Sequence, residues 1–141
     1  MACQSPLGKD SPNQAGELIF LAENTKMALT AFNYAEKLKT SLIVASSMLE
    51  LLSEIKGEAE LAGAEKMLIA YFNALILEVN IAANASKVEG FREIATNLQR
   101  AIEYVKQHNP MVAQRLVSEA ISMATTHGNW AAQKLKEKNL I

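Results

Sequence analysis

The chain contains few of the residues that most enzyme and metal sites require. Of its 141 residues, two are histidine and one is cysteine, and Asp10 is its one aspartate. His108 and His127 lack the glutamate three positions earlier that a di-iron helical bundle needs, because Val105 and Ala124 stand there. Zinc-ligand spacings and Gly-x-Gly phosphate loops are missing as well. We therefore expect no metal, no cofactor and no catalytic residues, which favours a non-enzymatic protein.

The single cysteine and the small net charge indicate which cellular compartment and which binding partners to expect. Cys3 has no second cysteine to pair with, so a disulfide within the chain is excluded. The first eleven residues lack the charged-then-apolar order of a signal peptide, and a cytoplasmic location is the default expectation. The net charge of −1 gives no reason to expect nucleic-acid binding. An accessory subunit of a nucleoprotein assembly stays a third alternative, with Lys87, Arg92, Arg100 and Arg115 on phosphates.

Proline and glycine are also scarce, and they mark helix ends. Three N-terminal signals stand out, which are Ser11-Pro12, the capping box Ser86 to Glu89, and Asn109-Pro110. Ser11-Pro12 predicts the start of a first helix, and the other two signals predict helices from Lys87 to about His108 and from Pro110 to about Lys136. A further helix is expected from near Glu58 to Ala85. No segment alternates with period two. The sequence predicts an all-α fold, an antiparallel helical bundle of four to five helices over residues 12–138, after a disordered tail at residues 1–11.

The segment between Gly16 and Gly57 has neither glycine nor proline. A heptad-like apolar stripe runs through it, made of Leu21, Ala28, Ala31, Ala35, Leu38, Leu42, Ala45, Leu49 and Leu52. One unbroken helix would be about 60 Å long and would extend beyond its neighbours. We expect a break instead, near Lys39–Ser41 or Ser47–Glu50, because compact domains rarely leave a long apolar stripe uncovered.

The most apolar segment, MLIAYFNALILEVNIAA from Met67 to Ala83, has two apolar faces separated by two polar seams. A membrane span is disfavoured, because a central glutamate costs about 2 to 3 kcal/mol on insertion scales. The wide face suits the chain's own core. The narrow face consists of Ala70, Ala74, Leu77 and Ile81. Asn73 and Asn80 beside it either set the register between helices or mark a solvent-exposed seam.

These features lead to two main functional hypotheses. In the first, the protein is a scaffold, adaptor or assembly subunit that acts through protein–protein association. It would form a homodimer or higher homo-oligomer through the narrow face, with Asn73 and Asn80 at the interface. A different protein partner is also possible. The second is a bundle that binds a small apolar ligand or substrate in its core, with His127, Trp130 and Glu78 as the polar groups of the pocket. For His127 the simpler interpretation is a hydrogen-bonded residue near a helix end.

Overall fold

The computed structural model describes residues 4–141, with the side chains of residues 15–19 and 22–141. The fold is all-α, as predicted, and the described residues contain no strand. The helices are α1 (Gln4–Leu52), α2 (Glu58–Ser86), α3 (Gly90–Lys106) and α4 (Pro110–Glu137).

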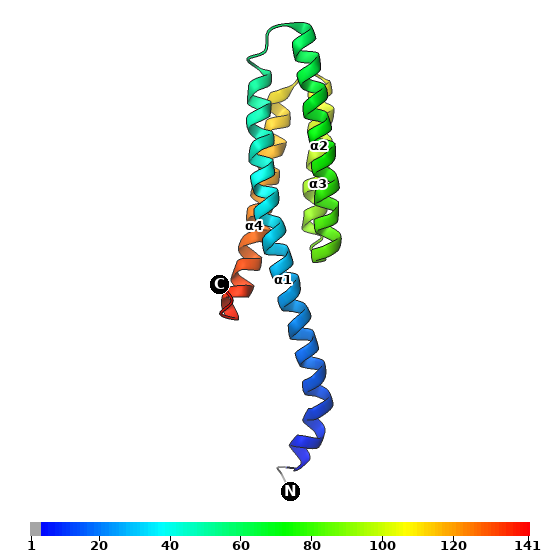
Figure 1. Ribbon diagram of the computed structural model, residues 1–141, viewed down its shortest axis with the longest axis vertical. Coiled ribbons are helices and arrows are strands. Elements are labelled where there is room, and N and C mark those ends of the chain that lie inside the picture. The colour runs from blue at the N-terminus through cyan, green and yellow to red at the C-terminus, as the bar shows by residue number, and fades with distance from the viewer. Residues whose placement is uncertain (1–3) are drawn as a thin grey trace.

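Each helix packs against two others (Figure 1). Helix α1 contacts α4 and α2, and α3 contacts α2 and α4. In the described part of the chain, the backbones of α1 and α3 are not direct neighbours, and neither are those of α2 and α4. The contact between α1 and α4 is the most extensive of the four. Alanines occupy much of it, and the buried Gly128 of α4 lies so near α1 that an added Cβ would be 3.2 Å from the Cβ of Ala35.

The expected break in the first helix is wrong, because α1 is continuous from Gln4 to Leu52. At one expected break the Thr40 hydroxyl donates to the Glu36 carbonyl at 3.2 Å within the helix, so it caps nothing. The apolar stripe is buried from Ala28 to Leu52. The N-terminal part of α1 instead extends beyond the other helices, with Leu18 and Ile19 exposed (Figure 1).

Of the two predicted helix starts in the C-terminal half, the one at Asn109 agrees with the structure and the one at Ser86 does not. The Asn109 side chain accepts a hydrogen bond from the backbone N–H of Val112 at 3.4 Å, which confirms the predicted cap of α4. The Ser86 hydroxyl accepts from the backbone N–H of Val88 at 3.2 Å, a bond of the N-cap type, and also donates to the Ala82 carbonyl at 2.7 Å. Ser86 is nevertheless the last residue of α2, and α3 begins only at Gly90.

The predicted N-terminal signal at Ser11-Pro12 also has a different outcome, because α1 begins at Gln4. Residues 1–3 lie outside the described residues, as do the side chains up to position 14. The expected disordered tail over residues 1–11 therefore stays a prediction.

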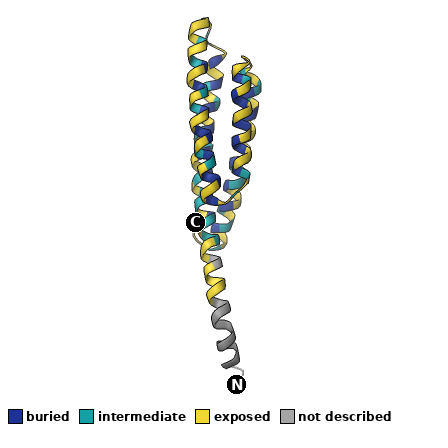
Figure 2. Cartoon of the chain, turned by 90° about the vertical axis from the view of Figure 1, so that its right-hand side faces the viewer, coloured by how far each residue is buried: buried dark blue, intermediate teal, exposed yellow. Residues whose placement is uncertain are grey.

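The core lies between the four helices, and the buried positions recur along each of them (Figure 2). Its largest fully buried side chains are Phe72, Phe91, Leu38, Leu42, Leu49, Leu68, Ile94, Leu98 and Leu135. The predicted wide face of α2 belongs to this core, since Leu68, Phe72, Leu75, Ile76 and Val79 are buried.

Candidate functional site

The predicted narrow face of α2 lies on the surface, and no other helix of the described chain covers it. Ala70, Ala74, Leu77 and Ile81 are all exposed. The exposed fraction is 63% for Leu77 and 49% for Ile81. The chain's own helices therefore leave the narrow face uncovered.

The exposed face is longer than the sequence analysis recognised. It includes four more exposed small or apolar residues, and we call the whole set the α2 stripe: Ala59, Gly63, Met67, Ala70, Ala74, Leu77, Ile81 and Ala85. On a helix turning about 100° per residue, all eight lie within about 40° of one line. The steps of three and four residues between them are the signal in the sequence that marks the full stripe, and Ala59, Gly63 and Ala85 lie outside the apolar segment from Met67 to Ala83.

The spacing within the α2 stripe is symmetric. Counted from either end, the steps are four, four, three, four, three, four and four residues. The midpoint falls at Phe72, which itself points into the core. A second α2 placed antiparallel with its own midpoint at this level would therefore align each stripe residue with another stripe residue.

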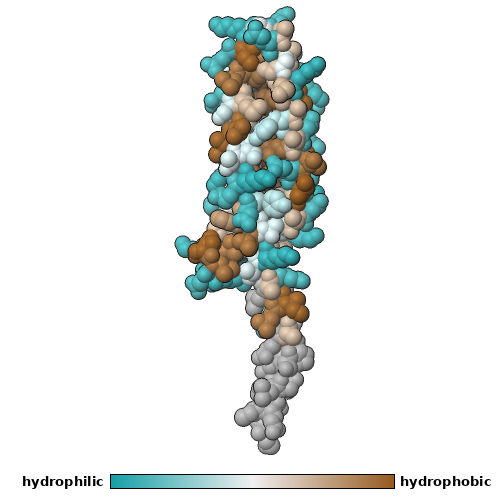
Figure 3. Space-filling model, in the orientation of Figure 1, coloured by the Kyte–Doolittle hydropathy of each residue, from teal (hydrophilic) through white to brown (hydrophobic). Residues whose placement is uncertain are grey.

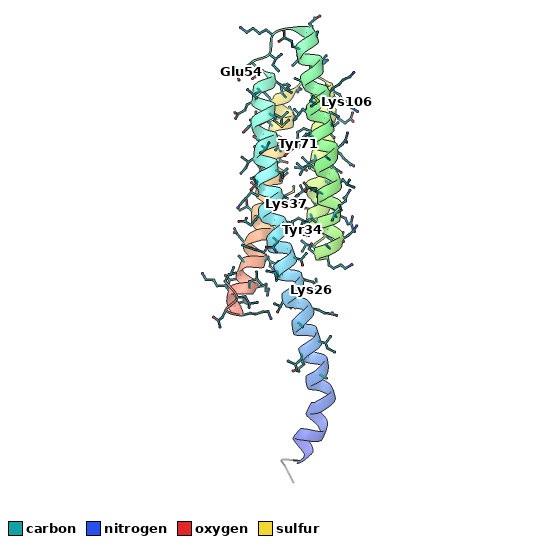
Figure 4. The ribbon with its side chains drawn as sticks, in the orientation of Figure 1. Lys26, Tyr34, Lys37, Glu54, Tyr71 and Lys106 are labelled. Carbon is teal, nitrogen blue, oxygen red and sulfur yellow. The ribbon has the colours of Figure 1, made fainter. Side chains whose placement is uncertain are left out.

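The flank of the stripe next to α1 is fixed by two contacts. The Lys37 ammonium lies 2.8 Å from a carboxylate oxygen of Glu78. The Tyr71 hydroxyl donates to the Ser41 carbonyl at 3.2 Å. Figure 4 shows Lys37 and Tyr71 where α1 and α2 face each other. Glu78 is thus already neutralised within the chain, and its hydrogen bond and negative charge raise the pKa of Lys37 above its ordinary value.

The other flank faces α3 and carries amides. Asn73 is exposed, Asn80 is half-buried, and Lys66 is exposed on the same side of the helix. Asn84 differs, because its amide oxygen accepts from a guanidinium nitrogen of Arg92 at 2.6 Å. The amide row is therefore at the protein surface, next to the α2 stripe.

Helix α1 also carries exposed hydrophobic side chains, which the sequence analysis did not predict. Val44 and Leu51 of α1 are exposed. On the face formed by α1 and α2, the hydrophobic side chains form separate groups with hydrophilic ones between them (Figure 3). This face therefore has narrow apolar strips and lacks a broad apolar patch.

The structure brings together two of the three residues predicted for a ligand pocket. His127 and Trp130 line an open recess of about 390 Å³, with Asn24, Met27, Lys87 and Val88. The His127 ring meets Phe91 edge-on, with 5.4 Å between the ring centroids. Glu78 lies elsewhere, in its pair with Lys37.

The four residues considered for phosphate contacts are dispersed. Arg92 pairs with Glu89 at 3.2 Å as well as with Asn84. Arg100 lines a shallow groove between α2 and α3, Lys87 lies at the turn after α2, and Arg115 is exposed on α4.

By length and composition α2 is able to cross a membrane, and it is the one such helix among the described residues. A third of its most apolar 18-residue window is buried inside the protein. Core helices of water-exposed domains pass the same test, so this finding alone is weak evidence for a membrane location.

Comparisons with family models, with curated proteins and with solved structures found no match for this chain.

Proposed function

We propose that the chain is an antiparallel helical bundle without catalytic activity that works by self-association, as a structural or assembly subunit, through the α2 stripe. The connections at residues 53–57, 87–89 and 107–109 are short, and short connections favour antiparallel neighbours in helical bundles. The occupant of the stripe in this proposal is a second copy of the chain.

The symmetric spacing of the stripe is the observation that carries the proposal. In an antiparallel pair about a two-fold axis, Gly63 faces Ile81 of the second copy and Met67 faces Leu77. Ala59 then faces Ala85, and Ala70 faces Ala74. Large residues thereby meet glycine or a flexible methionine, while alanines meet each other, so that two helix axes are able to approach closely along the whole stripe.

The amide flank supports the same arrangement. An antiparallel two-fold axis places equal flanks beside each other. Asn73 then lies next to Asn73 of the second copy, and two amides are able to donate to and accept from each other. Lys66 lies next to Asn80 of the second copy and is able to donate to its amide oxygen. On the flank next to α1, the Glu78 carboxylates of the two copies should repel each other little, because each one forms an ion pair with Lys37 of its own chain.

The size of the stripe predicts a weak dimer. From Ala59 to Ala85 the helix is about 40 Å long, and a contact strip about 10 Å wide gives roughly 400 Å² on each copy. A standard stable interface buries about 800 Å² on each partner. We therefore expect a dissociation constant on the order of micromolar.

Size-exclusion chromatography with light scattering tests self-association directly. The mass should rise from that of the 15.4 kDa monomer toward that of a dimer as the concentration passes through the micromolar range. A strictly monomeric protein at about 100 µM would overturn the proposal, because a micromolar dimer would then be largely formed. If the protein stays monomeric in buffer but partitions onto lipid vesicles, a membrane surface is the occupant and the proposal fails.

Cysteine pairing tests the orientation. In a Cys3→Ser background, the double variant Gly63→Cys/Ile81→Cys should form a disulfide-linked dimer under mild oxidation, because these positions face each other in the antiparallel pair. Gly63→Cys alone should not link, and Arg115→Cys, exposed on α4, is the matched control for random collisions. Efficient linking of Gly63→Cys to itself would show a parallel pair and contradict the antiparallel arrangement.

A further inference from the structure

A recess between α1, α4 and the turn that joins α2 to α3 has a lining unlike that of the α2 stripe. Its volume is about 390 Å³, near the lower end of the range for small-molecule sites. Met27 and Val88 supply apolar surface, and Trp130 supplies an aromatic ring that is 43% exposed. Lys87, Asn24 and His127 are its polar groups.

The fold itself produces this recess. Helices α2 and α3 meet at residues 87–89, while α1 and α4 continue beyond that turn (Figure 1). Side chains of α1 and α4 just below the turn, among them Met27 and Trp130, therefore have no helix on one side. The exposure of Trp130 follows from this early end of α2 and α3.

Lys87 stands at a position that favours glycine. Its φ of 62° places it in the left-handed region, where an L-residue other than glycine is strained. A glycine would end α2 in the usual way, with the same backbone hydrogen bond to the Ala83 carbonyl. Strained residues often lie at functional sites, and here the strained residue contributes the one lysine of the recess.

The charge of the recess indicates the ligand. No carboxylate is among the residues that line it, and within the described part of the chain Lys87 forms no ion pair. A smaller depression shares Met27 and Lys87 with the recess and is also lined by Lys26 and Glu23. A cation beside an exposed aromatic ring suits a planar anion, which is able to stack on the ring and accept from the ammonium group.

We propose that this recess binds a small aromatic carboxylate. The ring of the ligand stacks on Trp130 between Met27 and Val88, and its carboxylate accepts a hydrogen bond from Lys87. The side chain of Asn24 is placed to donate a second hydrogen bond. His127 is a wall of the recess, fixed against Phe91 and over Gly90, where an added Cβ would overlap its ring.

The single tryptophan of the chain provides the assay. In a ¹⁵N-correlated NMR spectrum its indole N–H gives one resonance, which should shift saturably on titration with 2-naphthoate. The neutral analogue 2-naphthamide should bind about tenfold more weakly, since it lacks the charge-assisted bond to Lys87. No saturable shift with 2-naphthoate at about 10 mM would overturn the proposal, as would equal affinity for the two compounds.

Two variants of Lys87 separate binding from folding. Lys87→Gly removes the ammonium group at a backbone position that suits glycine, so the fold is retained while affinity for 2-naphthoate falls about tenfold. Lys87→Arg should keep most of the affinity. Lys106→Gln removes the same charge at the far end of α3 and should change nothing (Figure 4). Unchanged affinity in a folded Lys87→Gly variant would refute the role of Lys87 and with it the proposal.

Discussion

Replacement of Leu77 by glutamate should dissociate the proposed dimer without unfolding the monomer. The Leu77 side chain is 63% exposed and therefore makes few contacts within its own chain. Full burial of a leucine contributes about 1.5 to 3 kcal/mol, so covering the exposed two-thirds contributes roughly 1 to 2 kcal/mol. A two-fold interface contains this contact twice, which gives roughly 2 to 4 kcal/mol for each dimer.

That free energy corresponds to roughly a 30-fold to 1,000-fold increase in the dissociation constant. The introduced carboxylate would also lie against Met67 of the second copy, and its desolvation weakens the pair further. Light scattering at several concentrations measures the dissociation constant, and thermal unfolding of the diluted protein measures monomer stability. Leu77→Ala should weaken the dimer less than Leu77→Glu. A Leu77→Glu protein that dimerises like the parent would refute the assignment of the interface, and one that unfolds would show that Leu77 supports the monomer.

Three further substitutions test the fold around the site. Asn97→Ala should lower the free energy of unfolding by about 1 to 3 kcal/mol in chemical denaturation, because the buried amide of Asn97 donates to the Leu116 carbonyl at 3.1 Å. Asn109→Ala should cost about 1 kcal/mol by the same assay, because it removes the cap of α4, and Asn109→Ser should restore most of it. The pKa of Lys37 is raised by Glu78, so the pair stabilises the fold at neutral pH and loses its effect as the pH rises through that pKa. In the Lys37→Met variant, the melting temperature should therefore fall less from neutral to alkaline pH than it does in the parent protein. The same dependence of the melting temperature on pH in both proteins would contradict this.

The sequence was sufficient where one local signal decided the outcome. Asn109-Pro110 predicted the start of α4, and the apolar spacing of residues 68–79 predicted which face of α2 is buried. It was insufficient where one side chain makes two bonds. The Ser86 hydroxyl donates backward to the Ala82 carbonyl and accepts from the Val88 N–H, yet α3 begins only at Gly90, so the capping signal did not set the start of this helix.

The break in α1 was predicted from a general argument about compactness, and that argument does not hold for this chain. It assumed that an apolar stripe must be covered along its whole length, whereas Leu18 and Ile19 of the same helix are exposed and Ala28 is the first buried residue among the described side chains. The exposure of Trp130 could not be predicted from the sequence either. It depends on where α2 and α3 end relative to α4 in the folded chain, and the residues next to Trp130 in the sequence contain no information about that position.

The length of α1 divides the molecule into regions of unequal local stability. Its 49 residues make a rod of about 73 Å, whereas the 29 residues of α2 span about 43 Å. Leu18 and Ile19 in the extending part of α1 are exposed, and isolated helical segments are only marginally stable in water. Amide hydrogen exchange should therefore quicken from Ala28 toward the start of α1. We expect the cooperative folding unit to end inside α1, so that the N-terminal part of this helix melts and re-forms independently of the core.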